Sequence, residues 1–599
     1  MTDGTGWPHR HRSLLTALLL MLAAWAMYLP SVRYGFVYYD DVRILRIHPE
    51  LYGQAKFTDN LREIFVTSFP REEPLLLRDV SWAFDSKVFG FGNAFGYHLG
   101  NVFLHSIVVA LMFAFLLGTT RRYGFALTVT VGWLALAIHT EPVAWIMGRK
   151  DILSTLFMLL ALCAQTRRLA AENLYAQCGW YLFALVSFMA GLLSKISVLT
   201  FPLVLFLHAV FLPYLNGERT VFEKFSWGRN LAKEILLMLP GLVISVLIYG
   251  WYRRTLTQMG ILDRGYTAHG LTHLWNLLMV DPFVVWVYVQ QTFIPWHLGV
   301  FYAWPQMPSD YPRWQIISAL ALTATAISLS WWLFRWRKDL FFYFTAFVVI
   351  MIPYLNLVFS GILVAERYLY FSAFCLLALA VSAAIGLVRS PRSLVRSGVL
   401  AAGIGLVAWN LYQAFSYQPA WRNGETLWQY HLALPSPATA AYANLAAYYY
   451  AEATAHQGVP EMAVAMRKMS VVVDAGLAQF WPDQKQSPPP DTYFLFFLKS
   501  IVQEVAGEPE AALASLLTAD RLRPKFDSTN LNLALLYHKL AGTAVDSGQK
   551  QTFARAARDR YAQYIALTWC GRPAPKEIQK QLAEFTADCS HTNLPAGKN

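Results

Sequence analysis

The feature that most constrains this chain is a series of long apolar segments separated by short loops. A helix needs about 20 mostly apolar residues to cross the hydrocarbon core of a membrane, where it satisfies its own backbone hydrogen bonds. About eleven segments approach that length; they are 14–30, 98–118, 124–138, 152–165, 178–193, 196–214, 232–250, 315–334, 340–359, 365–388 and 397–415. Only 14% of the residues are charged, against about 25% in soluble proteins. The sequence therefore predicts an all-α, polytopic membrane helix bundle.

The charges between these segments predict an orientation. Loops 119–123, 166–177, 215–231, 335–339 and 389–396 are all basic, and basic loops face the cytoplasm. Because these loops account for the excess of positive charge, nucleic acid is not an expected partner. Segment 14–30 follows a basic start and contains a small-x-small sequence, which also fits a signal peptide. Its apolar run continues past that sequence, so we interpret it as an uncleaved first helix with a cytoplasmic N-terminus.

This orientation also predicts the domain organisation. Segment 251–314 must then be one outer excursion, and its apolar piece 277–295 contains Asp281, Pro282 and Pro295, which fit an interfacial or re-entrant helix better than a span. We expect a membrane domain over 1–415, with a first outer loop at 31–97, and a tail over 416–599 outside the cytoplasm.

The tail has a different composition from the membrane domain. Its charges are frequent, its apolar residues recur at helical spacing, and prolines interrupt the pattern. Helix pairs are expected over 440–476, 494–524 and 530–567, which is the pattern of degenerate tetratricopeptide (TPR) repeats. Such repeats bind peptides or proteins, and a packed helical cap without a ligand is the alternative.

Two adjacent carboxylates, Asp40 and Asp41, lie just after the first apolar segment. Ionisable groups near the bilayer are costly and often functional, and adjacent acids can raise one another's pKa, which suits a general base. A solvated loop start or a helix cap is the alternative. In the second segment His98, Asn101 and His105 share one helical face, which must contact protein or a water-filled cavity. For His105, interhelical hydrogen bonding is the better interpretation.

A dense group of charges follows the third segment, with His139 and Glu141 followed by Arg149, Lys150 and Asp151. His139 and Glu141 have the chemistry of metal ligands, so a divalent cation is compatible with this motif, although the sequence requires no cofactor. Arg149 and Lys150 are suited to binding phosphate. A solvated turn would be simpler, but a turn between two spans seldom needs so many charges.

Further charges lie at the expected outer ends of other segments. Lys195 lies between two spans, and Glu366, Arg367 and Tyr368 begin the tenth. Local compensation between Glu366 and Arg367 is the alternative to a functional role. Acids beside several bases at a membrane surface suit an anionic, lipid-linked donor, because the bases bind phosphate and an acid deprotonates an acceptor.

Other kinds of site are not indicated. The sequence has no CxxC pair, no Gly-rich phosphate loop and no GxSxG motif, so zinc binding, nucleotide hydrolysis and serine hydrolysis have no support. Cys163, Cys178 and Cys375 lie in apolar segments and fit packing roles. Cys570 and Cys589 lie in the tail, and whether they form a disulfide depends on the tail being outside the cytoplasm.

The motifs occur in an order that resembles a known family. They are FVYYDD at 36–41, YHLGN at 97–101 with LH at 104–105, HTEPVAW at 139–145 with GRKD at 148–151, LSK at 193–195 and AERYLY at 365–370. WRN at 421–423, LW at 427–428, Pro435 and NLA at 444–446 follow them. This set resembles the transmembrane and TPR-containing O-mannosyltransferases and their bacterial relatives. The resemblance covers nearly the whole chain.

The resemblance implies a glycosyltransferase-C fold and transfer of a sugar, with inversion, from a polyprenyl-phosphate carrier on the outer or lumenal face. Asp40 and Asp41 match the position of the family's catalytic acid, and His139 and Glu141 match its second motif. The positions that match carrier phosphate are Arg149, Lys150, Lys195 and Arg367. The chain departs from the family at Ile196, where members often have Glu, and its repeats are fewer. These departures leave the sugar and the acceptor open.

The sequence hypothesis is therefore an inverting, polyprenyl-phosphate-sugar-dependent glycosyltransferase, with mannose as one candidate sugar and protein Ser or Thr as the acceptor, a glycan being the other. His98, Asn101, Asp151, Glu366 and Tyr368 are expected to support the site. The expected location is a bacterial inner membrane, with the tail in the periplasm. A transporter or flippase, or a non-catalytic scaffold whose TPR-like tail binds partners, are the alternatives.

Overall fold

The structure of the protein is a computed structural model. It describes residues 6–41, 44–45, 48–53, 56–66, 75–220, 230–258, 275, 278–302, 313–355, 362, 364–483, 486–524 and 526–569. Within these ranges the chain is helical and forms no strand, which confirms the predicted all-α class. Cys570 and Cys589 lie outside the described residues.

The chain divides into two compact units. The first comprises residues 1–255 and 266–427, and the second comprises 256–265 and 428–599. Each is described by itself below.

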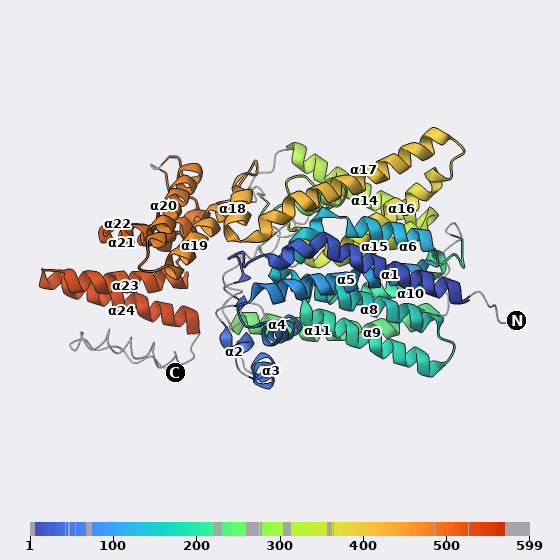
Figure 1. Cartoon of the computed structure of the whole chain (residues 1–599), viewed down its shortest axis with the longest axis horizontal. Coiled ribbons are helices and arrows are strands. Elements are labelled where there is room, and N and C mark those ends of the chain that lie inside the picture. Colours follow the sequence, from blue (N-terminus) through green and yellow to red (C-terminus); the bar gives the residue numbers. More distant parts are fainter. Residues whose placement is uncertain are drawn as a thin grey trace. The chain divides into compact units, whose positions relative to one another are not determined.

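The first unit is a bundle of long helices that run side by side (Figure 1). Its longer helices are α1 (Gly6–Tyr28), α5 (Ala94–Thr120), α6 (Tyr123–Leu134), α8 (Arg149–Ala170), α9 (Leu174–Ser194), α10 (Phe201–Leu215), α11 (Asn230–Gln258), α14 (Arg313–Trp336), α15 (Lys338–Met351), α16 (Leu369–Val388) and α17 (Ser393–Tyr417). Shorter helices are α2 (Pro49–Tyr52), α3 (Phe57–Val66), α4 (Leu76–Phe89), α7 (Thr140–Ala144), α13 (Asp281–Phe293) and α18 (Gly424–Leu432), which crosses the unit boundary.

Short 3-10 turns lie at the ends of several long helices. They are η1 (Leu29–Arg33), η3 (Ala137–His139), η4 (Ile146–Gly148), η5 (Ile196–Thr200), η7 (Ile352–Tyr354), η9 (Glu366–Tyr368) and η10 (Gln418–Arg422).

Eight described helices are long and apolar enough to cross a membrane, and α6 with residues 137–144, bent by 59°, makes a ninth if the pair is one span. Two segments that the sequence predicted as spans, α8 and α15, are not among them. Charges occupy both ends of α8, and α15 has only 14 residues. The polytopic membrane bundle is confirmed, with eight or nine candidate spans where about eleven were expected. The 13-residue α13 lies in the predicted outer excursion and is not a candidate span.

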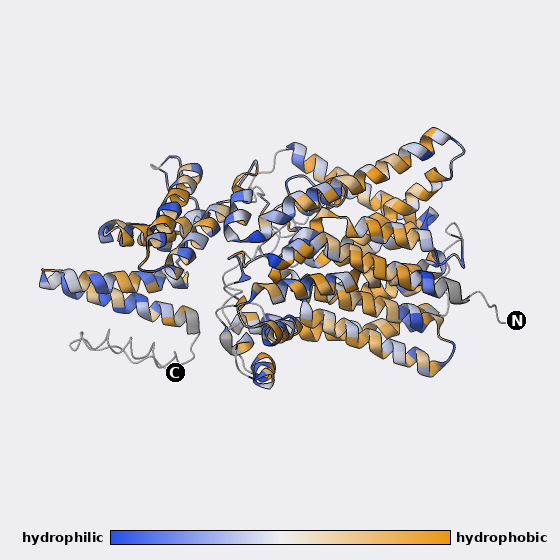
Figure 2. Ribbon diagram, viewed as in Figure 1, coloured by the Kyte–Doolittle hydropathy of each residue, from blue (hydrophilic) through white to orange (hydrophobic). Residues whose placement is uncertain are grey.

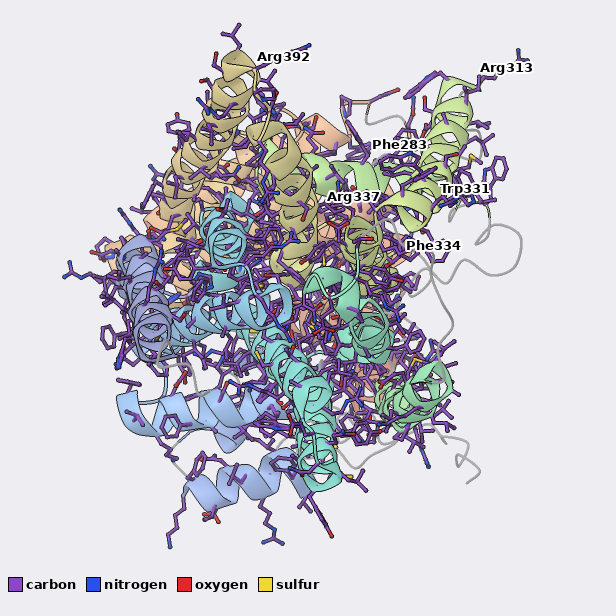
Figure 3. The ribbon with its side chains drawn as sticks, turned by 90° about the vertical axis from the view of Figure 1, so that its right-hand side faces the viewer. Phe283, Arg313, Trp331, Phe334, Arg337 and Arg392 are labelled. Atoms are coloured by element: carbon purple, nitrogen blue, oxygen red, sulfur yellow. The ribbon has the colours of Figure 1, made fainter. Side chains whose placement is uncertain are left out.

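The two ends of the bundle differ. The start of α1 and the ends of α5, α8 and α16 lie at its right-hand end in Figure 1. Figure 3 views this end, where Arg392 marks the tip of the turn between α16 and α17. In Figure 2 the helices between the two ends are mostly orange, that is, apolar. The ends of α5, α8 and α16, which adjoin loops predicted to be cytoplasmic, thus share one end of the bundle, and the motif-bearing starts of these helices lie at the other.

The second unit consists of antiparallel helix pairs. These are α19 (Thr439–Ala455) with α20 (Pro460–Phe480), α21 (Tyr493–Val505) with α22 (Pro509–Leu522), and α23 (Asp527–Thr543) with α24 (Ser547–Trp569). Successive pairs pack through α20 against α21 and α22 against α23. The second and third pairs begin about 34 residues apart, which is the TPR period. These are the three pairs expected from the sequence.

Candidate active site

The first acidic pair is divided by burial. Asp41 is 1% exposed, and its Oδ2 and Oδ1 accept hydrogen bonds from the backbone N–H of Val37 at 3.0 Å and from Trp145 Nε1 at 2.7 Å. Asp40 is only half-buried. Tyr38, which follows Val37 and lies two residues before Asp40, has a φ of +53°. This left-handed conformation costs energy in a non-glycine residue and is often found at functional sites. The motif therefore holds Asp41 inward and leaves Asp40 accessible.

Burial also changes the acidity of this pair. It raises the pKa of Asp41 from 3.8 to about 7, because the carboxylate loses hydration, and the charge of Asp40 contributes in the same direction. The hydrogen bonds from Val37 and Trp145 act in the opposite direction. The carboxyl group of Asp41 can therefore carry a proton near neutral pH.

Trp145 connects the acidic loop to the rest of the site. Besides its hydrogen bond to Asp41, its ring stacks on Tyr39 at 5.3 Å and lies 5.9 Å from the ring of Trp421. The guanidinium of Arg367 lies 5.5 Å from the centre of the same ring, a cation–π contact. Trp145 is 1% exposed, so it orients these groups through fixed packing.

Glu141 holds Arg367 from a distance of 226 residues in the chain. Its Oε2 accepts the backbone N–H of Arg367 at 2.9 Å, and its Oε1 forms an ion pair with Nη1. In the described part of the chain, Nε and Nη2 of Arg367 make no hydrogen bond. The guanidinium is therefore fixed in position but keeps donors for a ligand.

A second ion pair joins α8 to the end of α9. Nζ of Lys195 pairs with Oδ1 of Asp151, and it lies 4.8 Å and 5.2 Å from the ring centres of Tyr354 and Tyr368, which stack on each other at 4.3 Å. The other carboxylate oxygen of Asp151 is buried and has no hydrogen-bond partner. A buried acceptor without a donor is costly, so it is a good position for a ligand hydroxyl.

A cleft that contains about 370 Å³ of empty space, open solvent included, lies beside these two ion pairs. Asp151, Arg367 and Tyr368 form part of its polar wall, and its apolar wall includes Met158 and Phe201. The remaining lining residues are Ser154, Thr155, Ser197, Val198, Thr200, Ile350, Tyr354, Tyr370 and Phe371. The cleft thus presents charge at one wall and hydrocarbon at another, which suits an amphiphilic ligand.

Arg149, which the sequence predicted to bind phosphate, is used inside the protein. It is 1% exposed, it forms an ion pair with Asp85 at 2.7 Å, and it donates to the carbonyl of Tyr97 at 2.7 Å and to Oδ1 of Asn101. Asn101 in turn donates to the carbonyl of Trp145 at 2.8 Å. This network fixes the start of α8 against α4 and α5. Lys150 beside it is only half-buried.

A glycine makes this arginine network fit. A Cβ at Gly100 would lie 2.4 Å from Nη2 of Arg149 and 2.8 Å from Oδ2 of Asp85. At Gly148 a Cβ would lie 2.1 Å from the carbonyl oxygen of Pro142. Both glycines of the YHLGN and GRKD motifs are therefore required by close packing.

Glu366 and His98 connect other loops to the site. Oε1 of Glu366 accepts from the backbone N–H of Gly299 and from Tyr302 Oη at 2.7 Å, which ties the segment after α13 to the start of α16. His98 Nε2 lies 3.3 Å from the carbonyl oxygen of Gly35. Both side chains are 1% exposed, and both hold loops.

His139 does not join Glu141. Its ring lies 4.1 Å from Trp133 and 6.2 Å from His105, and His105 is 2.6 Å from Tyr370 Oη. Among the described residues, no three His, Cys, Asp or Glu side chains are arranged to hold a metal ion. The suggested metal pair is therefore split, with Glu141 bound to Arg367 and His139 in an aromatic cluster.

Sequence reasoning missed several partners. Asp85, Tyr302 and Tyr354 contact predicted site residues and carry no motif of their own. Trp145 was within a noted motif, but the motif gave no sign that its indole would bond to Asp41. The acids of α4, Asp79 and Asp85, were a usable signal, because an acid that becomes buried needs a partner.

Comparisons with known proteins find partial relatives. The chain is 29% identical to mouse protein O-mannosyl-transferase TMTC2 over 171 residues, which is 26% of this chain and 19% of the mouse protein. It is 29% identical to the human TMTC2 over 166 residues and 26% identical to the Drosophila melanogaster Tmtc2 over 205 residues. No family model and no solved structure matches the chain. The matches span about a fifth of each relative's length. Over that portion, this membrane protein is similar to proteins named as protein O-mannosyl-transferases.

Proposed function

We propose that the protein is an integral-membrane glycosyltransferase that moves a sugar from a polyprenyl-phosphate carrier to a Ser or Thr hydroxyl of a protein. The observation that carries this proposal is the series of contacts from the acidic pair to the cleft. Asp41 accepts a hydrogen bond from Trp145, and the ring of Trp145 contacts Arg367, which lines the amphiphilic cleft. Asp40, beside Asp41 in the chain, is half-buried. Mannose is the first sugar to test, because the similar proteins are named as O-mannosyl-transferases. The reaction would occur at the outer face, where the motif loops are predicted to lie.

Asp40 is the proposed general base. Its neighbour Asp41 is enclosed, with both oxygens accepting hydrogen bonds, so Asp41 acts as a positioning residue. Asp40 takes the proton of the acceptor hydroxyl as its oxygen attacks the anomeric carbon. The bond from that carbon to the phosphate oxygen breaks, and polyprenyl phosphate leaves with the electron pair. Attack opposite the leaving group inverts the configuration at that carbon.

Arg367 and Lys195 are the proposed sites of the carrier phosphate. Arg367 keeps Nε and Nη2 for a phosphate while Glu141 fixes its orientation. Lys195 is 8% exposed and lies beside the cleft through its pair with Asp151. Positive charge placed in advance stabilises the leaving phosphate without reorganisation. The apolar wall of the cleft would contact the first isoprene units, and Oδ2 of Asp151 would accept from a sugar hydroxyl.

Arg149 has a different role in this proposal. Its donors are used by Asp85, Asn101 and the carbonyl of Tyr97, so it supports the loop that carries Trp145. Lys150 remains a candidate for a weaker, more peripheral phosphate contact.

The helix pairs of the second unit are the proposed binding surface for the protein acceptor. Stacked helix pairs form extended surfaces that suit peptides. Deleting 430–599 should then reduce transfer to a protein acceptor more than binding of the lipid-linked donor, and equal transfer by the truncated chain would contradict this role.

The proposal is tested by replacing Asp40 with Asn and measuring transfer of mannose from polyprenyl phosphate to a Ser/Thr-containing acceptor in membranes. General-base catalysis contributes about 10²–10⁴-fold, so transfer should fall by that factor while donor binding persists. The control is Asp59→Asn in the same loop, where the side chain is exposed. Unchanged transfer by the Asp40 variant would refute the proposed role of the site.

A further inference from the structure

A second cleft lies away from the candidate active site, and the motif residues do not contribute to it. It contains about 420 Å³ of empty space, open solvent included, and lies among α8, α9, α10 and α11. Gln165, Arg168 and Glu234 form its polar end. The other lining residues are Tyr181, Ala184, Leu185, Phe188, Pro202, Leu205, Phe206, Leu237, Met238 and Gly241. Arg168 is about 25 Å from Asp151 along α8, at about 1.5 Å per residue.

The cleft is polar at one end and apolar along its length. On α11 the lining residues run from Glu234 through Leu237 to Gly241, a rise of about 10 Å. On α9 they run from Tyr181 to Phe188, over a similar rise. A Cβ on Gly241 would lie 3.0 Å from Pro202, so the apolar end closes where these two residues meet. The cleft therefore has the shape of a site for a head group followed by a hydrocarbon chain.

The polar end holds a buried ion pair with unused hydrogen-bonding atoms. Arg168 and Glu234 are 4% and 9% exposed. Arg168 donates through Nε to Oε1 of Gln165 at 2.9 Å and through Nη2 to Oε2 of Glu234. In the described part of the chain, neither Nη1 of Arg168 nor Oε1 of Glu234 makes a hydrogen bond. Each of these two charged groups therefore has one hydrogen-bonding atom left for a ligand, so this end suits a ligand that supplies both an acceptor and a donor.

The opposite charges of Arg168 and Glu234 determine which lipid head group can bind both. An anionic head group alone would pair with Arg168 but would be repelled by the carboxylate of Glu234. A choline head group carries a positive charge but has no N–H to donate to Glu234. A phosphoethanolamine head group supplies phosphate oxygens for Arg168 and an ammonium for Glu234, so it satisfies both.

The surroundings of the cleft suit the rest of such a lipid. Its apolar walls come from α9, through Leu185 and Phe188, and from α11, through Leu237 and Met238. We propose that this cleft is a specific binding site for phosphatidylethanolamine, with the head group between Arg168 and Glu234 and an acyl chain along α9 and α11. This end of α8 is the one that the basic loops predict to face the cytoplasm, which assigns the lipid to the inner leaflet.

The first test uses the unaltered full-length protein and varies the lipid. Native mass spectrometry of the purified chain, with equal amounts of two lipids of matched acyl chains, gives the ratio in which they bind. Phosphatidylethanolamine should exceed phosphatidylcholine and phosphatidylglycerol by about 10-fold, the factor for one hydrogen bond to a charged group. Mono- and dimethylated phosphatidylethanolamine should bind with intermediate strength, in order. Equal binding of all the lipids, or a preference for phosphatidylglycerol, would overturn the proposal.

The second test changes the protein. Glu234→Gln should reduce the preference for phosphatidylethanolamine over phosphatidylcholine about 10-fold. Its matched control is Glu218→Gln, which removes one partner of an exposed ion pair with Arg121 and should leave the preference unchanged. Because loss of one partner from a buried pair can unfold a protein, the double variant Arg168→Met with Glu234→Met replaces the pair with apolar side chains. That variant should bind the lipids without preference, and a retained preference would refute the assignment.

Discussion

The hydrogen bond between Trp145 and Asp41 offers the sharpest test of how the site is built. Replacing Trp145 with Phe keeps an aromatic ring against Tyr39 but removes the indole N–H that Oδ1 of Asp41 accepts at 2.7 Å. Asp41 is 1% exposed, so no water replaces the lost donor. A hydrogen bond to a charged group contributes about 1.5–3 kcal/mol, and leaving its partner unsatisfied costs a similar amount.

If this bond positions Asp40, its loss should appear in the transfer reaction. A change of 1.5–3 kcal/mol corresponds to a reduction of about 10–150-fold in kcat/KM. Asp41→Leu removes the same bond from the other side, because a leucine side chain has no acceptor atom. We expect each single variant to fall within that range.

The double variant makes the test decisive. Two changes that remove one shared interaction are not additive, so Trp145→Phe with Asp41→Leu should be about as impaired as Asp41→Leu alone, with a coupling energy of about 1.5–3 kcal/mol. The assay is transfer of sugar from polyprenyl phosphate by membranes that contain equal amounts of each variant. Trp180→Phe on the exposed face of α9 is the control and should be unaffected. If the reduction in kcat/KM of the double variant equals the product of the two single reductions, the two residues act independently, and the positioning role is refuted.

Three further outcomes are expected. Because burial raises the pKa of Asp41 from 3.8 to about 7, the folded state binds this proton more tightly than the unfolded state, so stability should fall by up to about 4 kcal/mol as pH rises from about 4 to 7. Thermal melts in detergent across that range should show the slope in the native chain and a flatter profile in Asp41→Asn; equal slopes would contradict it. Gly100→Ala should lower Tm, since its Cβ would lie 2.4 Å from Arg149 Nη2, whereas Gly124→Ala, with open space, should not. Arg367→Lys should raise the KM for the donor about 10-fold or more, because lysine lacks the forked guanidinium that bonds both carboxylate and phosphate. An unchanged KM in transfer assays would count against phosphate binding by Arg367.

Much of the architecture could be predicted from the sequence because it depends on local properties. Apolar length predicts a membrane helix, since backbone groups in lipid must bond within their own helix. The basic loops likewise predict which ends of the helices belong together, and the ends of α5, α8 and α16 do share one end of the bundle (Figure 1). The span count was less secure, because α15 has only 14 residues and α8 has charged ends.

The partners of the charged residues could not be predicted, because they depend on which helices pack together. Periodicity places Arg149 and Arg367 at helix starts, but it does not say that one is saturated by Asp85 and the other keeps free donors. Asp40 and Asp41 are equivalent in sequence, and only the packing of Trp145 buries one of them. The chain by itself determined a membrane bundle with acids and bases at one face and helix pairs after it. Tertiary structure decided which charged side chains pair with each other, because a buried charge is stable only where the fold brings it a partner.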